Sequence, residues 1–252
     1  MTDARSALIV AHGQPGDPGP AEAGFQSFGR QVAARLPGWR IAAATLAAPG
    51  ALEAALASLG PHPVVYPHFI SQGWFTRTHL PERLAAAGAA GAPVLAPFGD
   101  DPAARALALR LLTGAVAARG WSEPETTVVL AAHGSRSGAP EPSAAVAGFA
   151  AALAAGAQFR DIRQGFLEET PRLRDAAIGC GPRALCLPVF IARWGHVEHD
   201  LPDELGAAGF AGPTLAPLGS DPEAAAVVAS ALALAEARRG RDWRPATGRP
   251  SG

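Results

Sequence analysis

The sequence contains no lysine and no asparagine, so all 21 of its lysine-or-arginine positions are arginine. Without lysine, the chain can form neither a phosphate-binding loop that ends in Gly-Lys-Ser/Thr nor a lysine Schiff base. Without asparagine, a Cys-His-Asn catalytic arrangement is excluded as well. Any chemistry of this protein must therefore use other side chains.

Cysteine, net charge and long apolar runs are also scarce. Cys180 and Cys186 have the spacing of neither a zinc knuckle nor a redox CxxC, so we expect buried, reduced thiols. No segment reaches the ~20 apolar residues of a membrane span, and the N-terminal apolar run is too short for a signal peptide. The net charge of −1 predicts no binding to nucleic acid or anionic membrane. We therefore expect a globular cytoplasmic protein.

The chain contains an internal repeat. "LIVAHGQ" from Leu8 matches "VLAAHGS" from Val129, and the aligned histidines differ by 133 − 12 = 121. "PHFI" at Pro67 matches "PVFI" at Pro188 at the same offset, as "HLPERL" matches "DLPDEL". "LAPFGDDPAA" and "LAPLGSDPEA" match at an offset of 120. Four matches in the same order predict two homologous halves.

Each half alternates short apolar runs with helical patterns. In the first half, strands are expected at 7–10, 40–45, 64–67 and 93–96, and helices at 21–35, 50–59, 80–87 and 101–118; the second half repeats the pattern from Thr127. Asp-Pro pairs in "DDPAARALAL" and "SDPEAAAVVA" are typical of helix starts. The pattern predicts an α/β fold with two homologous doubly wound parallel-sheet domains that face a cleft. The domains are expected at 1–120 and 121–240, joined near 117–125, with a disordered tail at 241–252.

Three side chains of the second half lie just beyond predicted strands. They are His133 in "AAHGSRSG", Glu168 in "QGFLEETPRL" and His196 in "ARWGHVEHDLP". Ligands of such sheets bind at the carboxyl edge, where these loops meet. Two imidazoles and a carboxylate suit a divalent metal such as cobalt, iron or nickel, and imidazoles also exchange protons near neutral pH. The sequence therefore predicts a metal site in the second half.

The first half lacks this set. His12 is present, but Ala47 occupies the slot of Glu168, and Phe75 occupies the slot of His196, since 75 − 12 and 196 − 133 both equal 63. Alanine and phenylalanine cannot complete a metal site. We therefore interpret the chain as one working half, the C-terminal one, and one degenerate half.

Other residues near the motifs could have either a ligand-binding or a purely structural role. Trp74 and Trp194 could stack on a flat ligand or pack against their own loops. Arg136, Arg172 and Arg193 could pair with substrate carboxylates or simply be exposed. His79 and His199 could reach the cleft, but for His199 we rather expect a role as a helix cap or a solvated position. The remaining expectations are an N-cap at Asp200 and surface or edge positions for His62 and His68.

Together these motifs resemble a known family. "HGSR", "GFLE…P" and P-x-F-x-x-x-x-G-H-V-x-x-D-[IL]-P are similar to those of the sirohydrochlorin chelatases of the CbiX/SirB group, related to the ATP-independent class II chelatases. The resemblance spans residues 7 to 238 as a tandem long form. Two departures are a shorter "FLEETP" loop and a histidine pair kept in the second half, where long forms often keep it in the first.

The resemblance implies insertion of Co²⁺ or Fe²⁺ into sirohydrochlorin, on the way to cobalamin or sirohaem. It implies His133 and His196 as metal ligands and Glu168 as the acidic catalytic residue. Arg136, Arg193 and Trp194 are expected to hold the macrocycle. We expect a monomer whose metal (Co²⁺, Fe²⁺ or Ni²⁺) is a substrate and which keeps no permanently bound cofactor.

Two other function classes stay open. A non-catalytic carrier of cobalt, nickel or a tetrapyrrole would keep the histidines but would need no base at Glu168. A histidine-based hydrolase or phosphatase would typically show "RHG", whereas this chain has "AHG".

Overall fold

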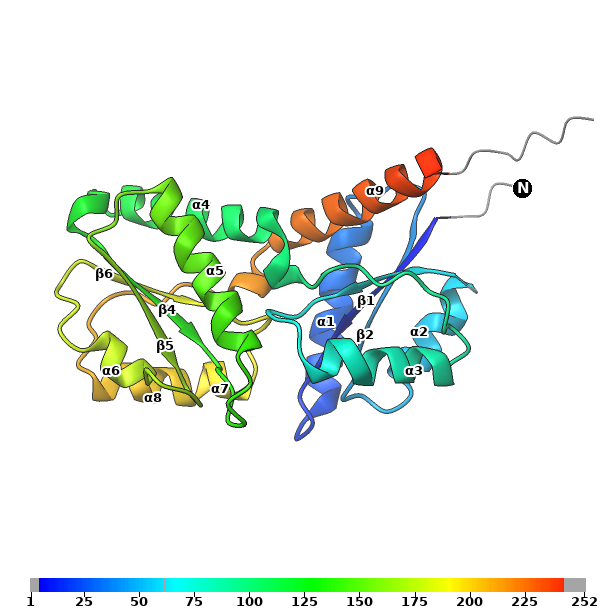
Figure 1. Cartoon of the computed structure of the whole chain (residues 1–252), viewed down its shortest axis with the longest axis horizontal. Helices are drawn as coiled ribbons and strands as arrows, with labels where there is room; N and C mark the ends of the chain where they lie inside the picture. The colour runs from blue at the N-terminus through cyan, green and yellow to red at the C-terminus, as the bar shows by residue number, and fades with distance from the viewer. Residues whose placement is uncertain (1–4, 61, 243–252) are drawn as a thin grey trace, which may run out of the picture.

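The computed structural model of the protein describes residues 5–60 and 62–242. The chain forms two lobes, each built on a three-stranded parallel sheet with helices on both faces (Figure 1). The strand orders are β2-β1-β3 in the N-terminal lobe and β5-β4-β6 in the C-terminal lobe. The strands are β1 (Ser6–Ala11), β2 (Arg40–Thr45), β3 (Val64–Pro67), β4 (Thr127–Ala132), β5 (Asp161–Phe166) and β6 (Ala184–Pro188). The predicted α/β class with parallel sheets is confirmed.

The helices follow the predicted alternation with the strands. The first half contains α1 (Pro18–Ala33), α2 (Ala51–Leu59), the π-helix η1 (Phe75–His79), α3 (Leu80–Ala86), the 3₁₀ turn η2 (Phe98–Asp100), α4 (Pro102–Ala118) and the 3₁₀ turn η3 (Glu123–Glu125). The second half contains α5 (Glu141–Gly156), α6 (Leu173–Ala177), α7 (Gly195–Glu198), α8 (Asp200–Ala207), the 3₁₀ turn η4 (Leu218–Ser220) and α9 (Ala224–Asp242). At the start of α4, the Asp101 carboxylate accepts the N–H of Ala103 at 2.8 Å, which confirms the predicted Asp-Pro helix start.

The pleat of the central strands divides the apolar side chains between two faces. Ile9 of β1 faces the layer that contains α1 and α9, whereas Leu8 faces α2 and α3. In the same way, Leu130 of β4 faces α4 and α5, and Val129 faces α6 and α8. Because successive side chains of a strand point to opposite faces, a strand that is apolar throughout must be covered on both sides.

The last helix of each half packs on the other half. In Figure 1, α4 lies over the C-terminal lobe, where it contacts α5 and β6, and α9 lies over the N-terminal lobe, where it contacts α1 and β3. One apolar core therefore continues through both lobes, from Phe28 of α1 to Phe149 of α5. This exchange ties the two lobes together more firmly than a single linker would. The domain boundary near residue 120 stays a prediction.

Two sequence-based expectations differ from the structure. The expected strand at 93–96 is reduced to one bridge, between Val94 and Val65, because proline at positions 93 and 97 cannot donate to a ladder. The expected tail at 241–252 begins inside α9, which continues to Asp242, and residues 243–252 lie outside the described part. Within the described residues, no helix has the length and hydropathy to cross a membrane.

Candidate functional site

The register of two neighbouring strands places His133 beside Glu168. Ala132 at the end of β4 lies opposite Phe166 at the end of β5, and the backbone N–H of Glu168 then donates to the carbonyl oxygen of His133 at 2.8 Å. The N-terminal lobe repeats this geometry, since the N–H of Ala47 donates to the carbonyl of His12 at 2.9 Å. Alanine thus stands at the backbone position where the C-terminal lobe has its carboxylate.

A following glycine orients each histidine ring. The His133 Nδ1 lies 3.1 Å from the carbonyl oxygen of Gly134, and the His12 Nδ1 lies 2.8 Å from that of Gly13. A carbonyl only accepts, so Nδ1 carries a proton, and in the neutral imidazole the lone pair available to a metal is then on Nε2. Gly134 has a φ of +77°, and a Cβ there would lie 2.7 Å from that of Glu169. Only glycine fits this turn.

Glu168 forms a bidentate ion pair with Arg136. Both nitrogen–oxygen distances are 2.7 Å, and the Glu168 side chain is 19% exposed whereas that of Arg136 is 83% exposed. The hydrogen bonds from Arg136 lower the pKa of Glu168 from its usual value near 4.5 to about 2; desolvation opposes this shift, and the charges of Arg136, His133 and Arg172 add to it. The carboxylate is therefore ionised at neutral pH and weakly basic while Arg136 holds it.

The interlobe cleft is the cavity that both His12 and His133 line, and its volume is about 670 Å³. Its walls are mostly apolar and come from both lobes: Phe69, Ile70 and Phe75 from one, and Val146, Val189, Phe190, Ile191, Trp194 and Val197 from the other. An apolar cleft with a histidine from each lobe suits a flat apolar ligand that meets a polar group near its centre.

His196 lies in the short helix α7, and its side chain is outside what the structure describes. Its neighbours Gly195 and Val197 line the interlobe cleft, so the backbone of α7 borders that cavity. In the other lobe, the Phe75 ring packs edge-on against His12 with ring centroids 4.2 Å apart. Among the described side chains, no three His, Cys, Asp or Glu residues are grouped to hold a metal ion. A site that needs His196 thus stays a prediction.

Arg193 and Trp194 border a second cavity, which we call the α1-side pocket. It has a volume of about 590 Å³, is lined by Arg193, Ser27, Gln31 and His68 among others, and shares Gln14, Trp194 and His199 with the interlobe cleft. Trp194 is half-buried, packs against the continuous core and lines both cavities. Of the three residues expected to hold the macrocycle, Trp194 lines the cleft, Arg193 lines the adjoining pocket and Arg136 pairs with Glu168.

His68 is buried, not at the surface or edge as predicted. It is 1% exposed, its Nε2 lies 2.8 Å from the Gly219 carbonyl oxygen, and its ring stacks on Phe28 with centroids 4.5 Å apart. Burial lowers the pKa of His68 to about 4, and the contact with Gly219 opposes this shift. Its repeat counterpart is Val189, since 68 + 121 = 189, and that apolar residue is the signal that indicates burial. His68 joins the N-terminal lobe to the turn before α9.

The remaining candidates lie near the rims of the lobes. Trp74 is 59% exposed and stacks on His79 with ring centroids 4.9 Å apart, so these two rings cover each other. His199 is the N-cap residue of α8, without a side-chain capping bond, and lines the cleft. The expected N-cap, Asp200, is instead the first residue of α8, because α7 ends at Glu198 and only His199 separates the two helices. His62 is exposed, as predicted.

Both thiols are free and buried, as predicted. Burial raises the pKa of Cys186 to about 12 and also raises that of Cys180. Both thiols are therefore protonated at neutral pH.

Comparisons with known proteins found similar proteins for this chain. The CbiX family model matches residues 127–235, the half that contains His133 and Glu168. No match was found among curated protein sequences. The solved structure of CbiX, described as the terminal enzyme for siroheme biosynthesis in denitrifying bacteria, is 43% identical, with a TM-score of 0.84 over 92% of this chain and 99% of that chain.

Two structures of a more distant protein share the fold. SirB from Bacillus subtilis with Fe³⁺ is 16% identical, with a TM-score of 0.75 over 94% of this chain and 98% of that one. SirB from Bacillus subtilis subspecies spizizenii in complex with cobalt is 16% identical, with a TM-score of 0.69 and the same coverage. At these identities the likeness concerns the fold alone. Because 43% identity extends over nearly the full length of the CbiX structure, this chain belongs to the CbiX family.

Proposed function

We propose that this protein is a sirohydrochlorin chelatase, which inserts Co²⁺ or Fe²⁺ into sirohydrochlorin without ATP. The observation that carries the proposal is the placement of His133 at the carboxyl edge of β4, in the wall of the apolar interlobe cleft, with its proton on Nδ1. A relative of 43% identity is described as an enzyme of siroheme biosynthesis, and a distant one has been solved with iron and with cobalt.

The metal is a substrate in this proposal, so it must be held and then released. His133 and His196 would hold the divalent ion from one face of the macrocycle. Two imidazoles bind it less firmly than the four protein ligands of a structural zinc site, which favours transfer to the ring. The four pyrrole nitrogens then replace the histidines as ligands.

Two pyrrole N–H protons must leave before the ring can bind the metal. Glu168, helped by a histidine, is the proposed acceptor, but a carboxylate with a pKa of about 2 is a weak base. Its basicity rises when Arg136 moves away, and the 83% exposure of the Arg136 side chain allows that movement. A carboxylate on the edge of sirohydrochlorin is a suitable new partner for Arg136. Substrate binding would thus release the base at the moment it is needed.

The rest of the macrocycle would be held by the cleft and its surroundings. The apolar walls cover the ring faces, and Trp194 offers an aromatic surface at the junction with the α1-side pocket. Arg193 would meet a ring-edge carboxylate that enters this pocket. No nucleotide takes part, in agreement with the missing lysine.

The proposal is tested by mixing purified full-length protein with sirohydrochlorin and Co²⁺ or Fe²⁺ and following the absorbance of the ring. We expect insertion much faster than in the protein-free control. Comparison of kcat/KM for Co²⁺, Fe²⁺ and Ni²⁺ then identifies the metal. Binding of the ring without any acceleration would contradict the enzyme and identify a tetrapyrrole carrier instead.

A further inference from the structure

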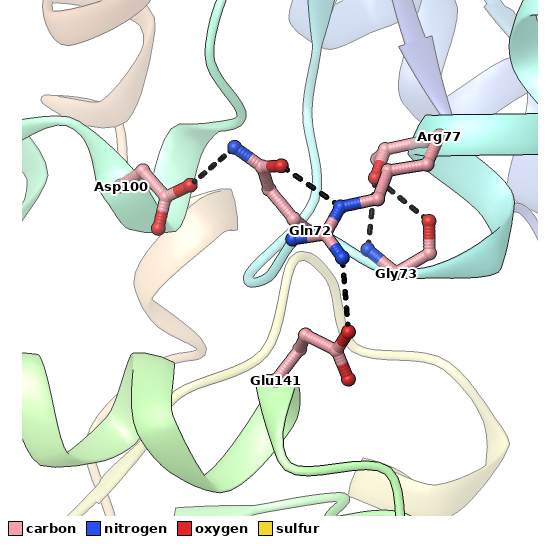
Figure 2. A network of polar contacts seen from close by, with 6 residues as sticks. Gln72, Gly73, Arg77, Asp100 and Glu141 are labelled. Carbon is pink, nitrogen blue, oxygen red and sulfur yellow. Dashed lines mark hydrogen bonds and ion pairs between the residues drawn. The ribbon is translucent and has the colours of Figure 1, made fainter.

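An arginine of one lobe pairs with a glutamate of the other beside the cleft. Arg77 of η1 donates from Nη1 to Oε1 of Glu141, the first residue of α5, at 3.1 Å (Figure 2). Arg77 also donates from Nε to the Gln72 side-chain oxygen at 3.2 Å, and the Gln72 amide donates to Asp100 at 3.2 Å. The N-terminal lobe therefore holds the guanidinium in place, and the C-terminal lobe supplies its anion.

This ion pair, the Arg77–Glu141 bridge, lies at the rim of the interlobe cleft. Phe75, two residues before Arg77, lines the cleft from the N-terminal lobe. Pro142, the residue after Glu141, lines it from the C-terminal lobe. The bridge thus spans the two walls between which a flat ligand would sit.

The charges around the cleft indicate what else Arg77 can bind. Among the described residues that line the cleft, none is an arginine, and Asp200 is the only ionisable residue besides the histidines. Arg136 is held by Glu168, and Arg193 lines the α1-side pocket. A macrocycle with carboxylates around its edge needs cations at the rim, not within the apolar walls. Arg77 is a cation held at that rim.

The present partner of Arg77 is easily replaced. The Arg77 and Glu141 side chains are 57% and 30% exposed, and exposed ion pairs of this kind contribute little to stability. A guanidinium offers five N–H donors in a plane, which match a second carboxylate as well as the first. Exchange of one carboxylate for another therefore has a small energetic cost.

We propose, on the basis of the proposed function, that Arg77 is a substrate-positioning residue that exchanges Glu141 for a ring-edge carboxylate of the tetrapyrrole. Glu141 keeps the guanidinium oriented in the ligand-free protein and competes with the substrate for it. The exchange also releases the contact between η1 and α5, so that the two walls can adjust around the ring.

The test measures the Kd of metal-free sirohydrochlorin by fluorescence titration of full-length variants. Arg77→Gln removes the cation and leaves Glu141 to repel the substrate, so we expect Kd to rise about two- to five-fold. Glu141→Gln removes the competitor and leaves Arg77 in place, so we expect Kd to fall by a similar factor. These opposite changes should shrink at high salt, because the charges are exposed.

A bridge that only fixes the lobes would give changes of the same sign in both variants. Changes of the same sign, or no change in either, would therefore overturn the proposal. Glu53→Gln is a matched control, because it breaks the exposed Arg83–Glu53 pair of 2.9 Å in the same lobe and should leave Kd unchanged. Thermal melts check that each variant is folded.

Binding and insertion are separate assays, so the two proposals can fail separately. Wild-type protein that binds and metallates the ring, with variants that change Kd in the same direction, would reject only the role of Arg77. Wild-type protein that binds the ring without metallating it, with opposite changes in the variants, would reject the chelatase and keep Arg77. Wild-type protein that does not bind sirohydrochlorin would reject both.

Discussion

The backbone N–H of Glu168 donates to the carbonyl oxygen of His133 at 2.8 Å, while the Glu168 carboxylate turns to Arg136. Strand register thus places the proposed metal ligand beside the proposed base. Arg136, from the loop after β4 that also contains His133, holds the base in an ion pair. In the proposed C-terminal site, His133 would bind the metal, Glu168 would accept protons, and Arg136 would control the basicity of Glu168.

Loss of either C-terminal histidine should abolish metal insertion. His133→Ala and His196→Ala each remove a proposed ligand, and we expect the rate to fall by about 100-fold or more. His12→Ala should retain most of the activity, because Ala47 and Phe75 leave that lobe without further ligands. Insertion rates followed by ring absorbance provide the measurement. Equal losses in all three variants would contradict the assignment of one working half.

The pKa of Glu168 should return toward its usual value when Arg136 is replaced. In the wild type it is lowered to about 2, so the ion pair stabilises the fold fully above the ordinary value near 4.5 and is lost as the pH falls toward 2. Arg136→Gln should therefore lower Tm at pH 6 but have little effect at pH 2. A titration of the Glu168 carboxyl by NMR reads the same change directly. A pKa near 2 in the variant would show that Arg136 is not its main cause.

Gly134→Ala should destabilise the protein more than Gly138→Ala. Both glycines have a positive φ, so an alanine is strained at either position, by about 1–2 kcal/mol. Only at Gly134 does the new Cβ also meet neighbours, at 2.7 Å from the Glu169 Cβ, which should raise the total to about 2–4 kcal/mol. Urea unfolding gives the free energy of unfolding of each variant, and the difference between the two values is the cost of the steric contact at Gly134. Equal losses would show that the turn relaxes around the added methyl group.

His68 should make the stability depend on pH between about 4 and 6.5. Its folded-state pKa is about 4, whereas the unfolded chain takes up the proton near 6.5, so the unfolded state binds more protons in this window. Stability is therefore full above pH 6.5 and falls on acidification, by on the order of 3 kcal/mol at pH 4.

His68→Leu tests this assignment. The variant should lose the extra pH dependence and, at pH 7, lose about 1–3 kcal/mol from the unpaired Gly219 carbonyl. Chemical unfolding at pH 7, 5.5 and 4.5 compares the two proteins. Parallel pH profiles would mean that folding does not lower the pKa of His68.

The sequence by itself predicted most of what local patterns and strand register control. Alternating apolar runs located the strands around Leu8 and Leu130, and the repeat offset related Ala47 to Glu168. Parallel strands end at one edge of a sheet, so residues that follow adjacent strands, such as His133 and Glu168, must be neighbours. These outcomes depend on the backbone within one lobe.

Only the tertiary structure decided how the two lobes share side chains. The packing of α4 on α5, the burial of His68 against Gly219, and the bridge between Arg77 and Glu141 all join segments far apart in the sequence. Long side chains on loops have many rotamers of similar energy, and the choice among them depends on which partner the other lobe brings within reach. Sequence periodicity carries no information on that docking. The partners of the arginines, and with them the proposed control of the base and of the cleft rim, follow from the three-dimensional structure alone.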